Sequence, residues 1–271
     1  MTPTRPRAAS IAAFLLVIIP GGAALADSFD PSRAQLVDLT HPFNTSTVYW
    51  PTTPGGFTYL RTANGKTEGG WFYAAGGFRA PEHGGTHMDA PLHFKENGTP
   101  ADQVSLDHLI APVVVIDVTS QAAANPDYEM QMTDIMTFEV QHGPIARGTI
   151  VLLRTGWSSK YPDRKEYLGD DTPNDASNLH FPAFGEETMR FLVEQRGVAA
   201  VGLDTASLDI GKSTTFMAHR IASAAGVPGF ENLTNLDKLP AKGAWLMALP
   251  MKIEGGSGGP LRAVAMIPEG H

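Results

Sequence analysis

The sequence contains no cysteine among its 271 residues. Without thiols the chain can form no disulfide, and it can hold no iron–sulfur cluster or thiolate zinc site. A cysteine nucleophile is excluded for the same reason. Any soft or borderline metal ion would therefore have to be bound by histidine, aspartate or glutamate side chains.

Positive charge is also scarce. The chain has 20 lysines and arginines against 28 acidic residues, a formal net charge of −8 and an isoelectric point near 5.5. Nucleic-acid binding needs clustered basic side chains against the phosphates, so we expect no nucleic-acid partner. The hydrophobic fraction of 42% and the charged fraction of 18% are ordinary for a globular protein, which excludes a disordered chain.

Long apolar runs are confined to the N-terminus. Arg5 and Arg7 precede the apolar residues 8–19, and residues 24–26 read Ala-Leu-Ala. This layout predicts a secretory signal peptide over residues 1–26. A membrane anchor is the alternative, but the run is shorter than the ~20 residues that a spanning helix needs. We expect an exported, periplasmic protein without a stable membrane anchor after cleavage.

The remainder, residues 27–271, contains no repeat or linker and is predicted to form one domain. Five apolar or β-branched runs predict strands, at residues 113–118, 149–154, 198–203, 244–249 and 261–267. Three segments predict helices, at residues 132–141, 185–196 and 216–225. Because helices lie between strands, the sequence predicts an α/β domain with a central mixed β-sheet or barrel and a few flanking helices.

Three of the nine histidines lie within residues 83–93, which read HGGTHMDAPLH. Two glycines and a proline oppose a helix here. In an extended segment, side chains two residues apart share a face, so His87 and Asp89 would lie ~6.6 Å apart at Cα and could reach one cation. His83 can join them only if the glycines bend the chain. A polar loop is the alternative, but the spacing favours a metal site formed by His83, His87 and Asp89.

His93 lies four residues beyond Asp89. It could be a fourth ligand, or it could stand beside the metal ion and transfer protons. Histidine suits proton transfer because its unperturbed pKa is ~6.5. The spacing alone leaves both roles open.

The string H-x-G-T-H-x-D-x-P-x-H, which residues 83–93 match, resembles the signature of the metal-dependent cyclase-like hydrolases. That family includes bacterial kynurenine formamidase and isatin hydrolase. Further similar strings extend the resemblance along the chain, at residues 38–42, 50–51, 202–209, 219 and 231–233. The resemblance implies the family's cyclase-like fold, of the swivelling β/β/α type.

The resemblance also implies a ligand set. By matching position, His83, His87 and Asp89 would bind one ion, and Asp89 would bridge to a second. His219 and Glu231 would hold, or help to hold, that second ion. Zinc is the expected cofactor, as one or two ions, with manganese as the alternative divalent metal.

Matching position assigns the remaining site residues. His93 would be the general acid/base, and Trp50 would line the substrate pocket, with core packing as the alternative for Trp50. Phe43, Trp71 and Phe72 are further pocket candidates from the sequence alone.

Two aspartates in the similar segment at residues 202–209 have no assigned role. Asp204 and Asp209 either orient metal-bound imidazoles or cap loops. Ile210 follows Asp209 where many relatives carry proline, which bears on the shape of this loop.

Residues 255–259 read Gly-Gly-Ser-Gly-Gly and match the G-x-S-x-G pattern of serine hydrolases. That pattern requires a helix after the serine, which Pro260 and the β-branched run behind it oppose. We therefore predict a hairpin turn. A serine hydrolase acting through Ser257 remains an alternative that a chelator would test.

Together these observations predict a secreted, divalent-metal-dependent hydrolase of small aryl amides, similar to kynurenine formamidase (arylformamidase). Hydrolysis of a cyclic amide or lactone, as by isatin hydrolase, is one alternative. A metal-dependent binding protein without turnover is another. The expected partner is a small-molecule amide or lactam, and the resemblance implies a homodimer.

Overall fold

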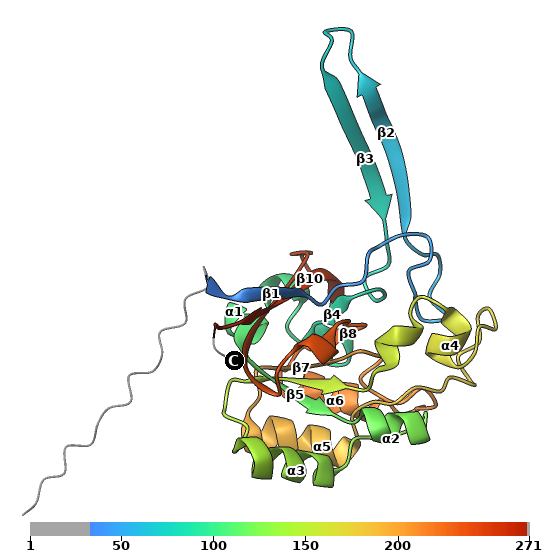
Figure 1. Ribbon diagram of the computed structural model, residues 1–271. Coiled ribbons are helices and arrows are strands. Elements are labelled where there is room, and N and C mark those ends of the chain that lie inside the picture. Colours follow the sequence, from blue (N-terminus) through green and yellow to red (C-terminus); the bar gives the residue numbers. More distant parts are fainter. Residues whose placement is uncertain (1–32, 270–271) are drawn as a thin grey trace, which may run out of the picture.

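The structure is a computed structural model that describes residues 33–269, so the predicted signal peptide lies outside the described residues (Figure 1). Its strands are β1 (Gln35–Asp38), β2 (Thr58–Lys66), β3 (Phe72–Arg79), β4 (His87–Asp89), β5 (Ile110–Asp117), β6 (Ile150–Arg154), β7 (Ala200–Leu203), β8 (Gly229–Glu231), β9 (Lys242–Pro250) and β10 (Gly258–Ile267). Its helices are α1 (Leu106–Leu109), α2 (Thr119–Ala124), α3 (Met132–His142), α4 (Arg164–Leu168), α5 (Glu186–Phe191) and α6 (Met217–Ala224). Within the described residues, no helix is both long and apolar enough to cross a membrane.

Seven strands form a closed mixed barrel. Their order is β10-β4-β8-β7-β6-β5-β9, and an antiparallel pairing of β9 with β10 closes the ring. Strands β5 to β8 are parallel to one another, the other pairs are antiparallel, and β1 joins the edge of β10. The predicted α/β fold with a central mixed sheet or barrel is confirmed.

The parallel strands are buried on both faces. In β5, Val113 and Val115 belong to the core inside the barrel, whereas Val114 and Ile116 belong to a second core beneath the helices. Strands buried on two faces need continuous apolar runs rather than alternation. The predicted strands were visible in the sequence for this reason, and all five are present.

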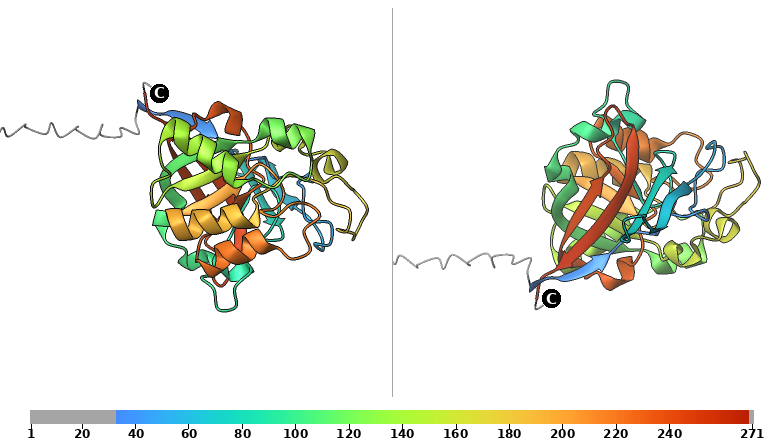
Figure 2. Two further views of the ribbon diagram at one scale, coloured as in Figure 1. Left: turned by 90° about the horizontal axis from the view of Figure 1, so that it is seen from below. Right: turned by 90° about the horizontal axis from the view of Figure 1, so that it is seen from above.

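The helices α3, α5 and α6 cover the outer face of the parallel strands, as the view from below in Figure 2 shows. Each corresponds to a helix predicted from the sequence. The segment predicted as one helix over residues 185–196 is divided, because its last turn, Leu192–Arg196, has π-helical geometry. These helices occupy the crossovers between parallel strands.

Strands β2 and β3 form an arm that the sequence did not predict. They pair only with each other and project from the body as a two-stranded ribbon (Figure 1). Trp71 and Phe72, two pocket candidates from the sequence, lie on this arm with 64% and 65% of their surface exposed. Neither residue is among those that line the cavity at the metal centre described below, so in this structure both belong to the arm.

Candidate metal centre

The site lies at the end of the barrel toward which the parallel strands run. There β4 runs antiparallel to β8, and the register places His87 opposite Glu231 and Asp89 opposite Gly229. Ligand sites of α/β proteins usually lie beyond the carboxyl ends of parallel strands. The barrel thus positions His87, Asp89 and Glu231 on rigid backbone next to one another.

Two glycines bend the chain directly before β4. Gly84 has φ +147° and Gly85 has φ +58°, conformations that other residues rarely adopt. A Cβ at Gly84 would lie 2.1 Å from a ring carbon of Tyr49, so no side chain fits there. The bend returns His83 to the strand, where its Nδ1 lies 2.6 Å from Oδ1 of Asp89.

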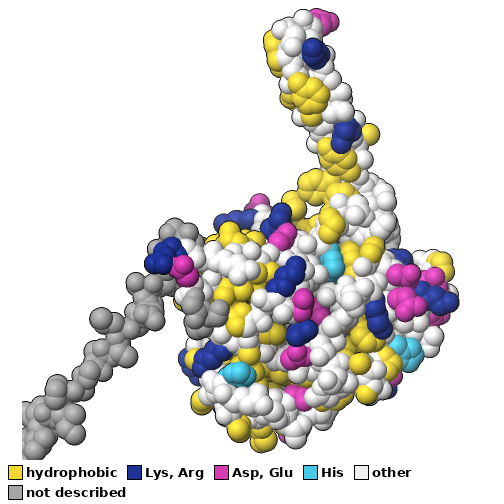
Figure 3. Space-filling model, viewed as in Figure 1, with side chains coloured by type: hydrophobic (Ala, Val, Ile, Leu, Met, Phe, Trp, Pro, Cys, Tyr) yellow, Lys and Arg dark blue, Asp and Glu magenta, His cyan; other side chains and the backbone are white. Residues whose placement is uncertain are grey.

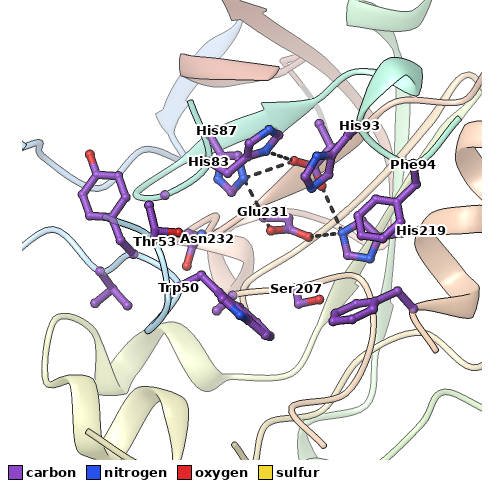
Figure 4. A pocket seen from close by; sticks show the side chains of 16 residues that line it. Trp50, Thr53, His83, His87, His93, Phe94, Ser207, His219, Glu231 and Asn232 are labelled. Atoms are coloured by element: carbon purple, nitrogen blue, oxygen red, sulfur yellow. Dashed lines mark hydrogen bonds and ion pairs between the residues drawn. The ribbon is translucent and has the colours of Figure 1, made fainter. Parts of the chain in front are cut away.

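Figure 4 shows His83, His87, His219 and Glu231 gathered on one side of the cavity. The buried carboxylate of Asp89 connects the three histidines. Its Oδ1 lies 2.6 Å from Nδ1 of His83 and 3.2 Å from Nε2 of His87, and its Oδ2 lies 3.1 Å from Nε2 of His219. Glu231 lies 3.1 Å from Nε2 of His219 and 3.5 Å from Nε2 of His87. All five residues proposed as ligands from the sequence are therefore brought together.

In His87 and His219, the ring nitrogen that does not face the other ligands has a hydrogen-bond partner of its own. Nδ1 of His87 lies 3.0 Å from the carbonyl oxygen of Gly85, and Nδ1 of His219 lies 2.6 Å from Oδ2 of Asp209. Both partners accept a hydrogen bond, so each Nδ1 carries a proton, and each ring in its neutral form would present a lone pair at Nε2. Such partners orient metal-binding histidines in proteins.

Asp209 has both of the roles that the sequence left open, whereas Asp204 has one. Asp209 accepts hydrogen bonds from the backbone N–H groups of Ala218 (2.8 Å) and His219 (3.1 Å), so it caps α6 and also orients His219. Asp204 instead accepts from the backbone and side chain of Thr155. It anchors the loop that follows β6.

The electrostatics of the cluster favour positive charge. Burial alone would raise the pKa of Asp89, but the imidazoles of His93, His83 and His219 hold that pKa well below its ordinary value. Burial and the charge of Asp89 raise the pKa of Glu231. Burial opposes protonation of His219, yet hydrogen bonds to carboxylates raise its pKa well above the usual value. The two acids therefore need protons or a cation among them.

His93 stands beside the cluster on a 3-10 turn, Pro91–His93. Its ring stacks on that of His83 at 3.8 Å between centroids, and it lies 5.9 Å from the ring of His219. Burial lowers the pKa of His93 to about 4, so the ring is neutral near pH 7. It also remains within reach of a ligand role, because ligand atoms of Asp89, His93 and His219 lie within 4.8 Å of one another.

A cavity of about 260 Å³ opens above the cluster. Trp50, Phe94 and Phe216 form its aromatic wall, with the rings of Trp50 and Phe216 6.2 Å apart. Trp50 was expected from the sequence. Phe94 and Phe216 were missed, although Phe94 directly follows His93 and could have been found by that adjacency.

Phe43 lies outside the residues that line this cavity. Its ring packs behind the glycine bend, where a Cβ at Gly85 would come within 2.6 Å of it. The centroids of the Phe43 and Phe57 rings lie 5.8 Å apart. In this structure Phe43 supports the bend rather than the cavity.

The donor set fits a divalent metal ion. His83, His87 and Asp89 offer one ligand atom each, all within 4.8 Å of one another. Nε2 of His87 is buried and has no hydrogen-bond partner, which suits a ligand atom and would otherwise be costly. Imidazole and carboxylate donors are the ligands that zinc and manganese take in proteins.

Comparison with known proteins agrees with this geometry. Residues 37–210 match the model of the Cyclase family, whose description reads "Putative cyclase". Isatin hydrolase of Roseibium aggregatum is 35% identical over 210 residues, which cover 74% of this chain and 77% of that protein. Kynurenine formamidase of Salinibacter ruber is 30% identical over 241 residues, which cover 84% of this chain and 96% of that protein. The solved structure of isatin hydrolase A from Ralstonia solanacearum matches with a TM-score of 0.78 and 32% identity, covering 87% of this chain and 93% of that one. The chain therefore belongs to the cyclase family of hydrolases.

Proposed function

We propose that this protein is a divalent-metal-dependent hydrolase that cleaves the carbon–nitrogen bond of a small aryl amide, as a kynurenine formamidase does. The observation that carries the proposal is the convergence of three histidines on the buried carboxylate of Asp89, beneath an aromatic cavity, with Glu231 in contact with two of those histidines. The names of the relatives, isatin hydrolase and kynurenine formamidase, both denote hydrolysis of an amide bond.

The proposed ligands form two overlapping sets around Asp89. His83 and His87 would hold one divalent ion with Asp89. His219, whose Nε2 lies 3.1 Å from both Asp89 and Glu231, would hold a second ion together with those two acids. Zinc is the proposed ion and manganese the alternative. An ion bound here would lower the pKa of a water molecule from about 15.7 toward ~7 and polarise the substrate carbonyl.

The remaining steps belong to the protein's own side chains. His93 is neutral, because burial lowers its pKa to about 4, and its stacking on His83 keeps it beside the cluster. We assign it the transfer of a proton from the attacking water to the departing nitrogen. Trp50, which lies across the cavity from the histidines (Figure 4), would hold the aryl ring together with Phe216.

Hydrolysis of a neutral lactam such as isatin is the second candidate, and one observation favours it. Among the described residues that line the cavity there is no lysine or arginine. N-formylkynurenine carries an amino-acid carboxylate, which would find no basic partner there, whereas a lactam needs none. Comparing kcat/KM for the two substrates would decide between them.

We also propose that the protein is exported to the periplasm and that its leader is removed. The support is the sequence of residues 1–26, with its basic start, apolar centre and Ala-Leu-Ala ending. The mature protein purified from the periplasm should begin at Asp27, as N-terminal sequencing would show. Retention of the leader on the cytoplasmic protein would contradict export.

Removal of metal tests the reaction class. Elemental analysis of the purified protein should find one or two zinc or manganese ions per chain, because the ligand sets overlap at Asp89. Treatment with EDTA should abolish hydrolysis of N-formylkynurenine and isatin, and added zinc or manganese should restore it. Full activity in the chelator would instead point to a serine hydrolase.

Substitution of His93 separates catalysis from binding. His93→Ala should reduce kcat by ~10²-fold or more, because proton transfer is lost. Its metal content should match that of the wild type, as elemental analysis would check. Unchanged turnover would remove His93 from the mechanism, and loss of the ion would make His93 a ligand. A wild-type protein that binds metal but hydrolyses no amide, lactam or lactone would be a binding protein.

We further propose a homodimer in which the β2–β3 arm contacts a second copy of the chain. The arm extends about 30 Å by the strand rise, and a lone two-stranded ribbon is marginally stable in water. Six large apolar side chains are exposed along it (Figure 3): Tyr59, Leu60, Trp71, Phe72, Tyr73 and Phe78.

Charge favours a second copy as the arm's partner. The arm carries three basic residues, Arg61, Lys66 and Arg79, against one acid, Glu68, while the whole chain has a net charge of −8. A basic arm therefore suits the acidic body of another copy. In a twofold dimer the contact would occur twice, which doubles the area it buries.

The arm's role can be tested by light scattering. Wild-type protein should have twice the mass of the mature chain, and the double variant Trp71→Ser with Phe72→Ser should shift toward the monomer. Val140→Ser is the matched control, because Val140 is 87% exposed on α3 and lies off the arm. A monomeric wild type, or a double variant that stays dimeric, would contradict this proposal.

A further inference from the structure

A serine of the β9–β10 turn contacts His83 of the metal centre without lining the cavity. Ser257 is the middle residue of the G-x-S-x-G string, which forms a hairpin turn as predicted. Its Oγ lies 2.8 Å from Nε2 of His83 and 2.5 Å from Oε2 of Glu82. Its carbonyl oxygen accepts a hydrogen bond from the backbone of Ala90 at 2.9 Å, which fixes the turn against the histidine motif.

One arrangement satisfies these donors and acceptors and also leaves a lone pair on Nδ1 of His83 for a metal ion. As a carboxylate, Glu82 can only accept, so the hydroxyl proton of Ser257 points toward it. Ser257 Oγ then accepts from His83, which places a proton on Nε2 of that ring. In a neutral imidazole Nδ1 is then the atom with the lone pair, and it faces Oδ1 of Asp89 at 2.6 Å.

His83 differs in this respect from the other two histidines of the cluster. A carbonyl holds His87 and a carboxylate holds His219, and both groups can only accept. A hydroxyl can donate or accept, so Ser257 alone would not fix the ring. Glu82 removes the ambiguity, and its Oε2 is itself held by the backbone N–H of Ser257 at 3.0 Å.

We propose that Ser257 and Glu82 are positioning residues that hold His83 in the tautomer whose Nδ1 binds the metal ion. The assignment rests on the proposed metal site and explains how its most exposed histidine is oriented. The turn is also shaped around the ring, because a Cβ at Gly258 would lie 2.6 Å from Cε1 of His83. Groups that orient metal-bound imidazoles typically contribute ~10- to 100-fold in metal affinity.

The same contacts superficially match a serine protease triad, since Ser257, His83 and Asp89 follow one another at 2.8 and 2.6 Å. Two observations oppose a nucleophilic role. Ser257 is absent from the described residues that line the cavity, and its hydroxyl proton is directed to Glu82. In addition, strand β10 follows the serine, where a nucleophile elbow requires a helix.

A pair of variants of equal shape tests the proposal. Valine and threonine at position 257 fill the same space, but only threonine keeps a hydroxyl. Zinc affinity of the full mature protein, measured by competition with a chelator of known affinity, should fall ~10- to 100-fold in Ser257→Val. It should stay near the wild-type value in Ser257→Thr. Nitrogen-15 NMR of histidine-labelled, zinc-loaded protein should show the Nε2–H tautomer of His83 in wild type and threonine variant only.

Two variants of Glu82 form a second matched pair. They test the positioning role even if Ser257→Val does not fold. Glu82→Gln keeps an acceptor for the hydroxyl and should retain zinc affinity, whereas Glu82→Leu should lose it. Equal affinities in all four variants would overturn the positioning role and leave the proposed hydrolase intact. Covalent labelling of Ser257 by a fluorophosphonate would also overturn it. A wild-type protein that binds no divalent ion would overturn this role and the proposed function together.

Discussion

A carboxylate that is 4% exposed and surrounded by imidazoles is the constraint on which this molecule depends. Burying a charge is costly unless partners compensate for it, and Asp89 finds those partners on separate elements. His87 comes from the same short strand, His83 from the bend before it, and His219 from the first turn of α6. Removing any one of these imidazoles would leave the buried charge of Asp89 less well compensated. The elements at this end of the barrel are therefore arranged around Asp89.

The barrel makes that arrangement possible by placing a three-residue antiparallel strand beside a parallel one. Direct pairing of β4 with β8 brings His87 and Glu231 together, although they are distant in sequence. A site built on strands holds its geometry better than one built on loops. The loops contribute at the margin, through His93 and the aromatic wall, where adjustment to a substrate is useful.

Local sequence predicted those parts of the fold that local physics determines. The apolar runs at residues 113–118 and 149–154 identified strands because both faces of each strand are buried. Closure of the barrel could not be predicted in the same way, since it depends on pairing between β9, β10 and β4. The arm lacked a signal because glycine, alanine and polar residues interrupt its apolar side chains, and neither strand has a buried face within the described chain.

The site residues also divide into those that the local sequence predicts and those that it does not. His83, His87 and Asp89 could be predicted from spacing, since two residues share a strand face and a glycine bend returns the third. His219 and Glu231 lie far along the chain and were found only through the family resemblance. The contact of Ser257 with His83 was not foreseen, because the string around the serine describes a turn and says nothing of a residue 174 positions away.

The last strand of the chain also sets the order in which the molecule can be completed. β10 pairs with β1, β4 and β9, so the barrel stays open until this strand has been added. Long-range pairings of this kind form late in folding. The candidate ligands are therefore held in place only after the ring of strands has closed, so any ion would meet them in the folded protein.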